Sequence, residues 1–163
     1  MGRDNRGVKK LFIGTLFVTA TTLILFILSQ NSQPGSSLYS IRRLEEKLVF
    51  LTKRDPMEKA EFYSFLLDQR LDELKTIMNG KQEGHLILPS TLRYATTAGE
   101  YVNLIKQYGL TAESKNAKMQ FASHRKVIVE LSKKYKKKSP GDYTGKFIID
   151  DINYLDIYSK ELP

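Results

Sequence analysis

Three pairs of adjacent carboxylates are the residues of this chain best suited by type to acid–base chemistry. They are Glu45-Glu46, Asp72-Glu73 and Asp150-Asp151. Glycosidase-type catalysis needs two carboxylates that face one cleft. Neighbouring residues of a helix point roughly 100° apart, so none of these pairs converges by itself. We therefore interpret the three pairs as parts of solvated helix faces.

Two histidines accompany these acids, and the chain has no cysteine. His85 falls in a loop-like stretch, and His124 falls on an apolar helical stripe. A nucleophile–histidine–acid triad stays open, because serine and aspartate are common in the chain. The sequence nevertheless has no Gly-x-Ser-x-Gly elbow, no glycine-rich phosphate loop and no metal-ligand spacing. We expect a protein that is not an enzyme, with no catalytic residue, cofactor or metal; the alternative is an envelope hydrolase with an unrecognised site.

The strongest surface feature is basic. Segment 125–138 holds seven Lys or Arg residues against one Glu: Arg125, Lys126, Lys133, Lys134, Lys136, Lys137 and Lys138. Cations in the last turn of a helix compensate its dipole, which is one interpretation of the segment. The other is a surface for a polyanion. That partner would be nucleic acid inside a cell, and phospholipid headgroups or cell-wall polymers outside it.

The elements that must position these residues begin with an apolar run. Residues 11–28 are eighteen consecutive residues without a charge, preceded by Arg3, Arg6, Lys9 and Lys10. A helix of this length covers ~27 Å, which is close to the hydrocarbon thickness of a bilayer. Three interpretations compete: a permanent anchor, a cleaved signal peptide and a buried core helix. The run exceeds the usual signal-peptide core and no Ala-x-Ala site follows it, which favours the anchor.

Flanking basic residues tend to stay in the cytoplasm, and here they are concentrated before the run. The predicted organisation is a basic cytoplasmic tail (1–10), a transmembrane helix (11–28), a polar linker (29–37) and an extracytoplasmic domain (38–163). The lack of cysteine excludes lipoprotein processing and disulfides in that domain. The lack of cysteine and of glycosylation signals fits a bacterial cell envelope better than eukaryotic secretion.

Apolar spacing predicts helices over residues 37–53, 56–78, 91–108 and 111–135, and a short helix over 147–160, with a short strand over 147–149 as the alternative. Asp55-Pro56 is a start signal and Asn79-Gly80 a stop signal for the second of them. Because the first two helices are separated by two or three residues, they should form an antiparallel hairpin. Residues 81–88 are expected to form an extended loop. The predicted fold is all-α: one N-terminal transmembrane helix and a compact bundle of four to five helices built on this hairpin.

Two segments of the hairpin resemble a bacterial domain of unknown function, the one numbered 5667. The first is Pro34–Leu48, with Leu38-Tyr39 followed by Arg42 and Glu46; the second is Glu61–Lys75, with Arg70 and Glu73 near its end. The chain departs from the pattern at Ser40, where the family often has proline, and at Arg42, where lysine is usual. The resemblance covers residues 34–78 and implies an extracytoplasmic, singly anchored helical protein. It brings no catalytic residues.

The four charged residues of this pattern have a structural interpretation. Arg42 and Glu46 lie at i, i+4, and Arg70 and Glu73 lie at i, i+3. Each pair alone contributes a few tenths of a kcal/mol when exposed. Combined across the hairpin they would form a polar clip that fixes the register of the two helices. The alternative is a small anion site built on the two arginines.

Together these features predict a membrane-anchored, extracytoplasmic, non-enzymatic module. It would bind a partner protein or an anionic envelope surface near the bilayer, and no nucleic acid. The alternative from another class is a domain on the cytoplasmic side that binds nucleic acid through segment 125–138. Topology separates these two hypotheses.

Overall fold

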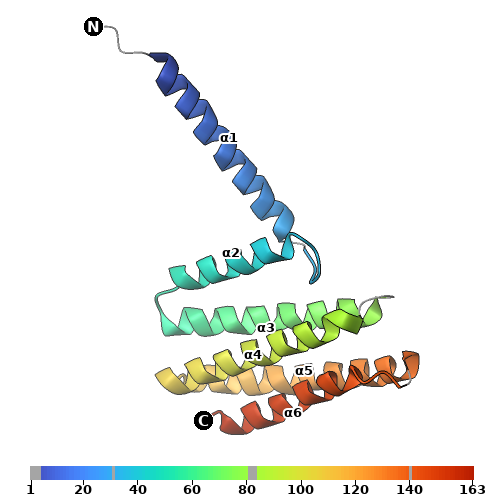
Figure 1. The fold of residues 1–163 in the computed structure, drawn as a ribbon. Coiled ribbons are helices and arrows are strands. Elements are labelled where there is room, and N and C mark those ends of the chain that lie inside the picture. Colours follow the sequence, from blue (N-terminus) through green and yellow to red (C-terminus); the bar gives the residue numbers. More distant parts are fainter. Residues whose placement is uncertain (1–4, 31, 81–83, 140) are drawn as a thin grey trace. The chain divides into compact units, whose positions relative to one another are not determined.

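The computed structural model describes residues 5–30, 32–80, 84–139 and 141–163. Six helices and no strand occur in these ranges, so the predicted all-α class is confirmed (Figure 1). The helices are α1 (Asn5–Ser29), α2 (Tyr39–Thr52), α3 (Pro56–Asn79), α4 (Gly84–Tyr108), α5 (Thr111–Lys138) and α6 (Gly145–Glu161). The chain divides into two compact units, Met1–Val49 and Phe50–Pro163.

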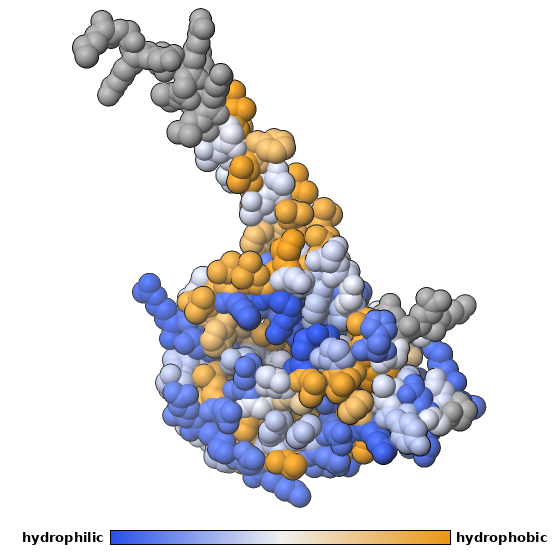
Figure 2. Space-filling model, viewed as in Figure 1, coloured by the Kyte–Doolittle hydropathy of each residue, from blue (hydrophilic) through white to orange (hydrophobic). Residues whose placement is uncertain are grey.

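Helix α1 contains one stretch, Phe12–Ser29, that is long and apolar enough to cross a membrane. Its large apolar side chains are exposed, which rules out a core helix (Figure 2). The hydroxyls of Thr19, Thr21 and Thr22 donate to the backbone carbonyls four residues earlier, each at 2.9 Å. These bonds satisfy the hydroxyls inside an apolar surface. A membrane anchor and a signal sequence both have such a helix.

Helix α2 is attached to the end of α1 by polar contacts within the first unit. Arg42 Nη1 donates to the carbonyl of Ser32 at 2.8 Å, and the Ser29 hydroxyl donates to the Glu45 carboxylate. The predicted apolar stripe of this helix is present, yet three of its leucines are exposed to solvent. Their exposed fractions are 54% for Leu44, 46% for Leu48 and 75% for Leu51.

The signals predicted at both ends of α3 operate in the structure. Asp55 is the N-cap, and its carboxylate accepts from the Met57 N–H at 3.0 Å, with Pro56 at the first helical position. At the other end the Gly80 N–H donates to the carbonyls of the last turn. Phe50 packs its ring on Tyr63 of α3, with the centroids 5.1 Å apart. Both residues belong to the second unit, which begins at Phe50.

The second unit is a bundle of α3, α4, α5 and α6 (Figure 1). Its most extensive pairings are α3 with α4 and α5 with α6, and α4 also packs on α6. The buried apolar side chains of these helices form its core. Core members include Ala60, Leu67, Leu71, Leu74, Met78, Ala98, Val102, Ile105, Phe121, Ile128, Leu131, Ile148 and Leu155. Gly109, at φ +63°, makes the tight turn between α4 and α5, a backbone conformation that glycine adopts at little cost.

The prediction of an extended loop over residues 81–88 is wrong for residues 84–88, which are helical; residues 81–83 lie outside the described part. Helix α4 begins at Gly84 and contains Pro89. Proline removes a backbone donor and disfavours a helix interior, which is why the sequence predicts a start after it. Burial decides otherwise: Ile87 is 1% exposed within the core. The two earlier turns of α4 are stabilised by that packing.

Candidate functional site

The C-terminal half of α5 carries the predicted basic surface. Helix α5 buries Phe121, Ile128, Leu131 and Tyr135 along one stripe, so the residues between them point outward. All seven basic residues of segment 125–138 are exposed. We refer to Arg125, Lys126, Lys133, Lys134, Lys136, Lys137 and Lys138 as the basic patch. The structure therefore places all seven on the exposed side of the C-terminal half of α5.

Two members of the basic patch have protein partners. Arg125 forms a two-pronged ion pair with Asp156 of α6, through Nε at 2.8 Å and Nη2 at 3.2 Å. Lys138 Nζ donates to the carbonyl of Gly80 at 2.6 Å, which ties the end of α5 to the end of α3. The other five lysines make no ion pair with any described residue. Their charge is available to an external anion.

A pocket of about 350 Å³ opens beside these lysines, at the turn between α5 and α6. Lys136 and Lys146 line it together with Ser132, Ser139 and Tyr143. Cations and hydroxyls of this kind suit an anionic group such as a phosphate or a carboxylate. Sequence reasoning found Lys136 but missed Lys146 as its neighbour, because the two are ten residues apart on different helices.

Asp142 also lines this pocket, and its carboxylate is occupied by hydrogen bonds. The Tyr135 hydroxyl donates to it at 2.5 Å, the backbone N–H of Thr144 donates at 2.9 Å, and the Thr144 hydroxyl also donates. These hydrogen bonds, led by the Thr144 hydroxyl, lower the pKa of Asp142. The Asp142 carboxylate therefore holds the turn between α5 and α6 in place through its hydrogen bonds.

His124 lies in a hydrogen-bonded chain that joins three helices. Its Nε2 is 2.8 Å from Asp68 Oδ1 on α3, and its Nδ1 is 3.0 Å from the Tyr94 hydroxyl on α4. Burial lowers the pKa of His124, so the neutral ring is the form that fits. In that form Nε2–H donates to Asp68 and Nδ1 accepts from the Tyr94 O–H; we assign this tautomer from the contacts.

This acid–histidine–hydroxyl order resembles that of a catalytic triad, but its hydroxyl is inaccessible. Tyr94 is fully buried, and burial raises the pKa of its phenol. A nucleophile must reach its substrate, so the arrangement acts as a polar tie between α3, α4 and α5. The spacing of His124 on the apolar stripe predicted its burial; its two partners lie on other helices and left no local signal.

The interpretation of the acidic pairs as parts of solvated helix faces is wrong for Glu73 and Asp151, which are buried. In Asp72-Glu73 the first residue is exposed and the second buried, and the same holds for Asp150-Asp151. His85 is exposed on α4. Within the described ranges, no group of three or more His, Asp or Glu side chains is placed to hold a metal ion.

Asp151 is the feature that sequence reasoning missed. It is 1% exposed, and its Oδ2 has no hydrogen-bond partner among the described residues. Burial, with a contribution from Asp150, raises the pKa of Asp151 to about 9. The carboxyl is thus protonated at neutral pH. It lines a small pocket of about 50 Å³ between α4 and α6, together with Leu92, Phe147 and Tyr154.

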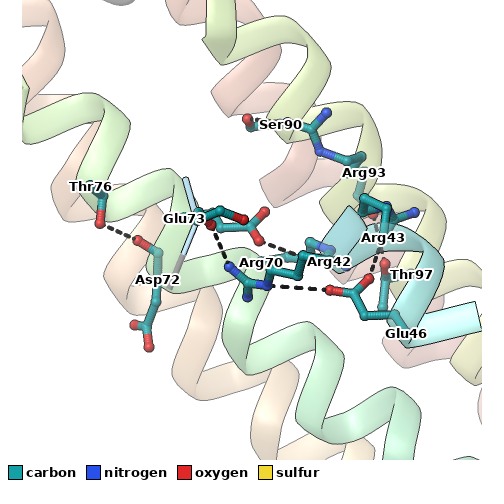
Figure 3. Close-up of polar contacts among 11 residues, drawn as sticks. Arg42, Arg43, Glu46, Arg70, Asp72, Glu73, Thr76, Ser90, Arg93 and Thr97 are labelled. Carbon is teal, nitrogen blue, oxygen red and sulfur yellow. Dashed lines mark hydrogen bonds and ion pairs between the residues drawn. The ribbon is translucent and has the colours of Figure 1, made fainter. Parts of the chain in front are cut away.

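The four residues predicted to form the polar clip make one ion pair on each helix. On α2, Arg42 Nε is 3.6 Å from Glu46 Oε1, and Arg43 Nη1 approaches Glu46 Oε2 at 2.7 Å. On α3, Arg70 Nη1 is 2.6 Å from Glu73 Oε1, and both side chains are buried (Figure 3). The connection of the two pairs across the helices stays a prediction.

A scan of protein-family models, a search of curated proteins and a search of solved structures gave no match to this chain. The resemblance of residues 34–78 to domain family 5667 therefore also stays a prediction.

Proposed function

We propose that this chain is a single-pass membrane protein whose helical bundle lies outside the cytoplasm and binds an anionic surface close to the bilayer. The role is binding, without catalysis. Helix α1 would be the anchor, because its apolar stretch Phe12–Ser29 matches the thickness of a bilayer and is exposed along its length. The four basic residues before this stretch support a cytoplasmic N-terminus.

The observation that carries the proposal is the set of five exposed lysines on α5 without a described partner, next to a cationic pocket. Near an anionic membrane each lysine contributes about 1 kcal/mol of binding free energy. Outside the cytoplasm the polyanions within reach are phospholipid headgroups and cell-wall polymers. An acidic face of a partner protein offers the same chemistry and is the competing outcome.

Topology is the first test of the proposal. A phosphatase that is active only outside the cytoplasm, fused after Pro163, should be active, and an N-terminal epitope tag should stay on the same polypeptide. Retention of the tag excludes a cleaved signal sequence. The control is a reporter at the same site that fluoresces only in the cytoplasm, and it should be dark. The opposite pattern would contradict the orientation and make nucleic acid the leading partner of the basic patch.

Neutralising three lysines of the basic patch should weaken binding to anionic vesicles roughly 100-fold, at about 1 kcal/mol for each lysine. The variant carries Lys133→Gln, Lys134→Gln and Lys137→Gln. The full chain is held in phosphatidylcholine nanodiscs, and its cosedimentation with vesicles of phosphatidylglycerol and phosphatidylcholine is measured. Binding of the unaltered chain should also fall as salt is raised, because the contact is exposed.

The matched control changes the net charge equally at exposed lysines outside the basic patch: Lys106→Gln, Lys115→Gln and Lys160→Gln. It should bind almost as well as the unaltered chain. Equal losses in both triple variants would indicate an effect of net charge alone. If the unaltered chain ignores anionic vesicles, a lipid surface is excluded, and binding to an acidic protein face becomes the hypothesis to test.

A further inference from the structure

We propose that α2 lies in the interfacial layer of the bilayer, with Leu44, Leu48 and Leu51 inserted among the lipid chains. The proposal rests on the proposed role of α1 as a membrane anchor. It adds a second membrane contact, made by a helix that follows the anchor and runs along the membrane surface. The occupant of the apolar face is lipid.

The first observation is the placement of the three leucines. At 100° per residue they lie within about 60° of one another on α2, and all three are exposed. Single exposed leucines are ordinary on soluble proteins, but an aligned stripe of them indicates a contact surface. Arg42 and Glu46 occupy the opposite face of the helix and pair with each other. Helix α2 is therefore amphipathic, with its apolar side uncovered.

The second observation is that α2 is held beside the end of α1. Arg42 is bonded to the Ser32 carbonyl and Glu45 to the Ser29 hydroxyl, where the apolar stretch of α1 ends. Residues 33–39 are folded into turns, with Ser36 N–H bonded to the Gln33 carbonyl at 3.0 Å and Tyr39 N–H to the Ser36 carbonyl at 3.1 Å. A helix fixed at this depth reaches the headgroup layer without any rearrangement.

The chemistry of the stripe matches that environment. Interfacial helices bury their apolar face about 5–10 Å into the boundary between headgroups and acyl chains. Lys47 is exposed at the edge of the stripe, where its aliphatic stem can lie along the lipid while its ammonium reaches a phosphate. A second copy of the chain could also cover three leucines. Lipid is favoured because the anchor keeps it beside α2 at every protein concentration.

The test uses tryptophan fluorescence, since the chain contains no tryptophan. Three full-chain variants are reconstituted in phosphatidylcholine bilayers with lipids brominated either near the headgroup or deep in the acyl chain. Leu48→Trp reports on α2, Phe17→Trp reports on the anchor, and Met119→Trp is the control at an exposed apolar site of α5, where Met119 is 57% exposed. Circular dichroism checks that each variant keeps its helices.

We expect Leu48→Trp to show blue-shifted emission and to lose most of its intensity to the shallow bromines. Met119→Trp should emit as in water and stay unquenched. Unquenched emission from Leu48→Trp overturns the inference, even if a protein contact shifts its wavelength. Strong quenching of Phe17→Trp by the deep bromines in the same experiment shows that the anchor is still in the bilayer. Equal quenching at positions 48 and 119 also overturns it. If Phe17→Trp is unquenched, the anchor itself fails, and the proposed function fails with it.

Discussion

Replacing Asp151 by asparagine is expected to stabilise the bundle at neutral and alkaline pH, and to leave its stability near pH 4 almost unchanged. The Asp151 carboxyl is buried between α4 and α6, and burial raises its pKa to about 9. An unfolded chain has an ordinary aspartate with a pKa near 3.9. The folded state therefore keeps a proton that the unfolded state loses.

The sign of the pH dependence follows from this difference. Between about pH 4 and pH 9 the unfolded state binds fewer protons, so the free energy of unfolding falls by up to about 1.4 kcal/mol for each pH unit. Above the folded pKa the carboxyl ionises and the slope ends. Asparagine has no charge to lose, so the slope should disappear in the variant. Over the roughly four pH units between the unfolded pKa and pH 8, this slope gives an expected gain on the order of 5 kcal/mol.

Urea unfolding of the full chain in a mild detergent, followed by circular dichroism at pH 4, 6 and 8, measures this effect. Asp150→Asn is the matched control, because Asp150 is the residue next to Asp151 and its carboxylate is exposed. That variant should change the stability only slightly at each pH. A gain for Asp151→Asn that is equal at pH 4 and pH 8 would contradict a buried, protonated carboxyl.

Replacing Arg70 by methionine is expected to lower the free energy of unfolding by about 3–5 kcal/mol. The Arg70 and Glu73 side chains are 0% and 3% exposed, and their charged atoms are 2.6 Å apart. Methionine keeps much of the side-chain volume but removes the charge opposite Glu73. A buried carboxylate that loses a cation 2.6 Å away is costly, whereas the intact pair is close to neutral in net stability.

The double variant Arg70→Met, Glu73→Met separates these two contributions. It should recover part of the loss, because the Glu73 carboxylate is then no longer left facing an apolar side chain in place of the Arg70 guanidinium. Urea unfolding under the conditions above is measured for the unaltered chain, for Arg70→Met and Glu73→Met singly, and for the double variant, which are the four corners of the cycle. Lys75→Met, which disrupts the exposed pair with Asp72, should cost less than about 1 kcal/mol. If Arg70→Met also lowers the free energy of unfolding by less than about 1 kcal/mol, the buried Glu73 carboxylate does not depend on Arg70.

Residues at the helix ends predicted most starts and ends of the helices, and tertiary packing determined where α4 begins. Asp55-Pro56, Gly80 and Gly109 act within one turn of chain, so their effects can be derived from neighbouring residues alone. Pro89 is the counterexample: its local preference indicates a helix start, and the burial of Ile87 extends the helix past it. Tertiary packing overrides a local preference when it offers enough apolar contact.

The candidate site divides in the same way. The basic patch could be predicted, because its seven residues lie within fourteen positions of one helix and charged side chains on a helix are normally exposed. The burial of Asp151 could not be derived in the same way, because it depends on the packing of α4 against α6. Its spacing, three residues after Ile148 and four before Leu155, placed it on the buried stripe of α6 and was the one available signal. The Tyr94–His124–Asp68 chain needed the positions of three helices and could not be derived from spacing.

The order of pairing in the bundle has a consequence for how the chain is made. Its two most extensive interfaces, α3 with α4 and α5 with α6, join helices that follow each other in the sequence across connections of a few residues. Such contacts close small loops and form quickly. With no cysteine to oxidise, folding of either pair needs no redox partner. The α3–α4 pair can therefore form before α5 and α6 have been synthesised.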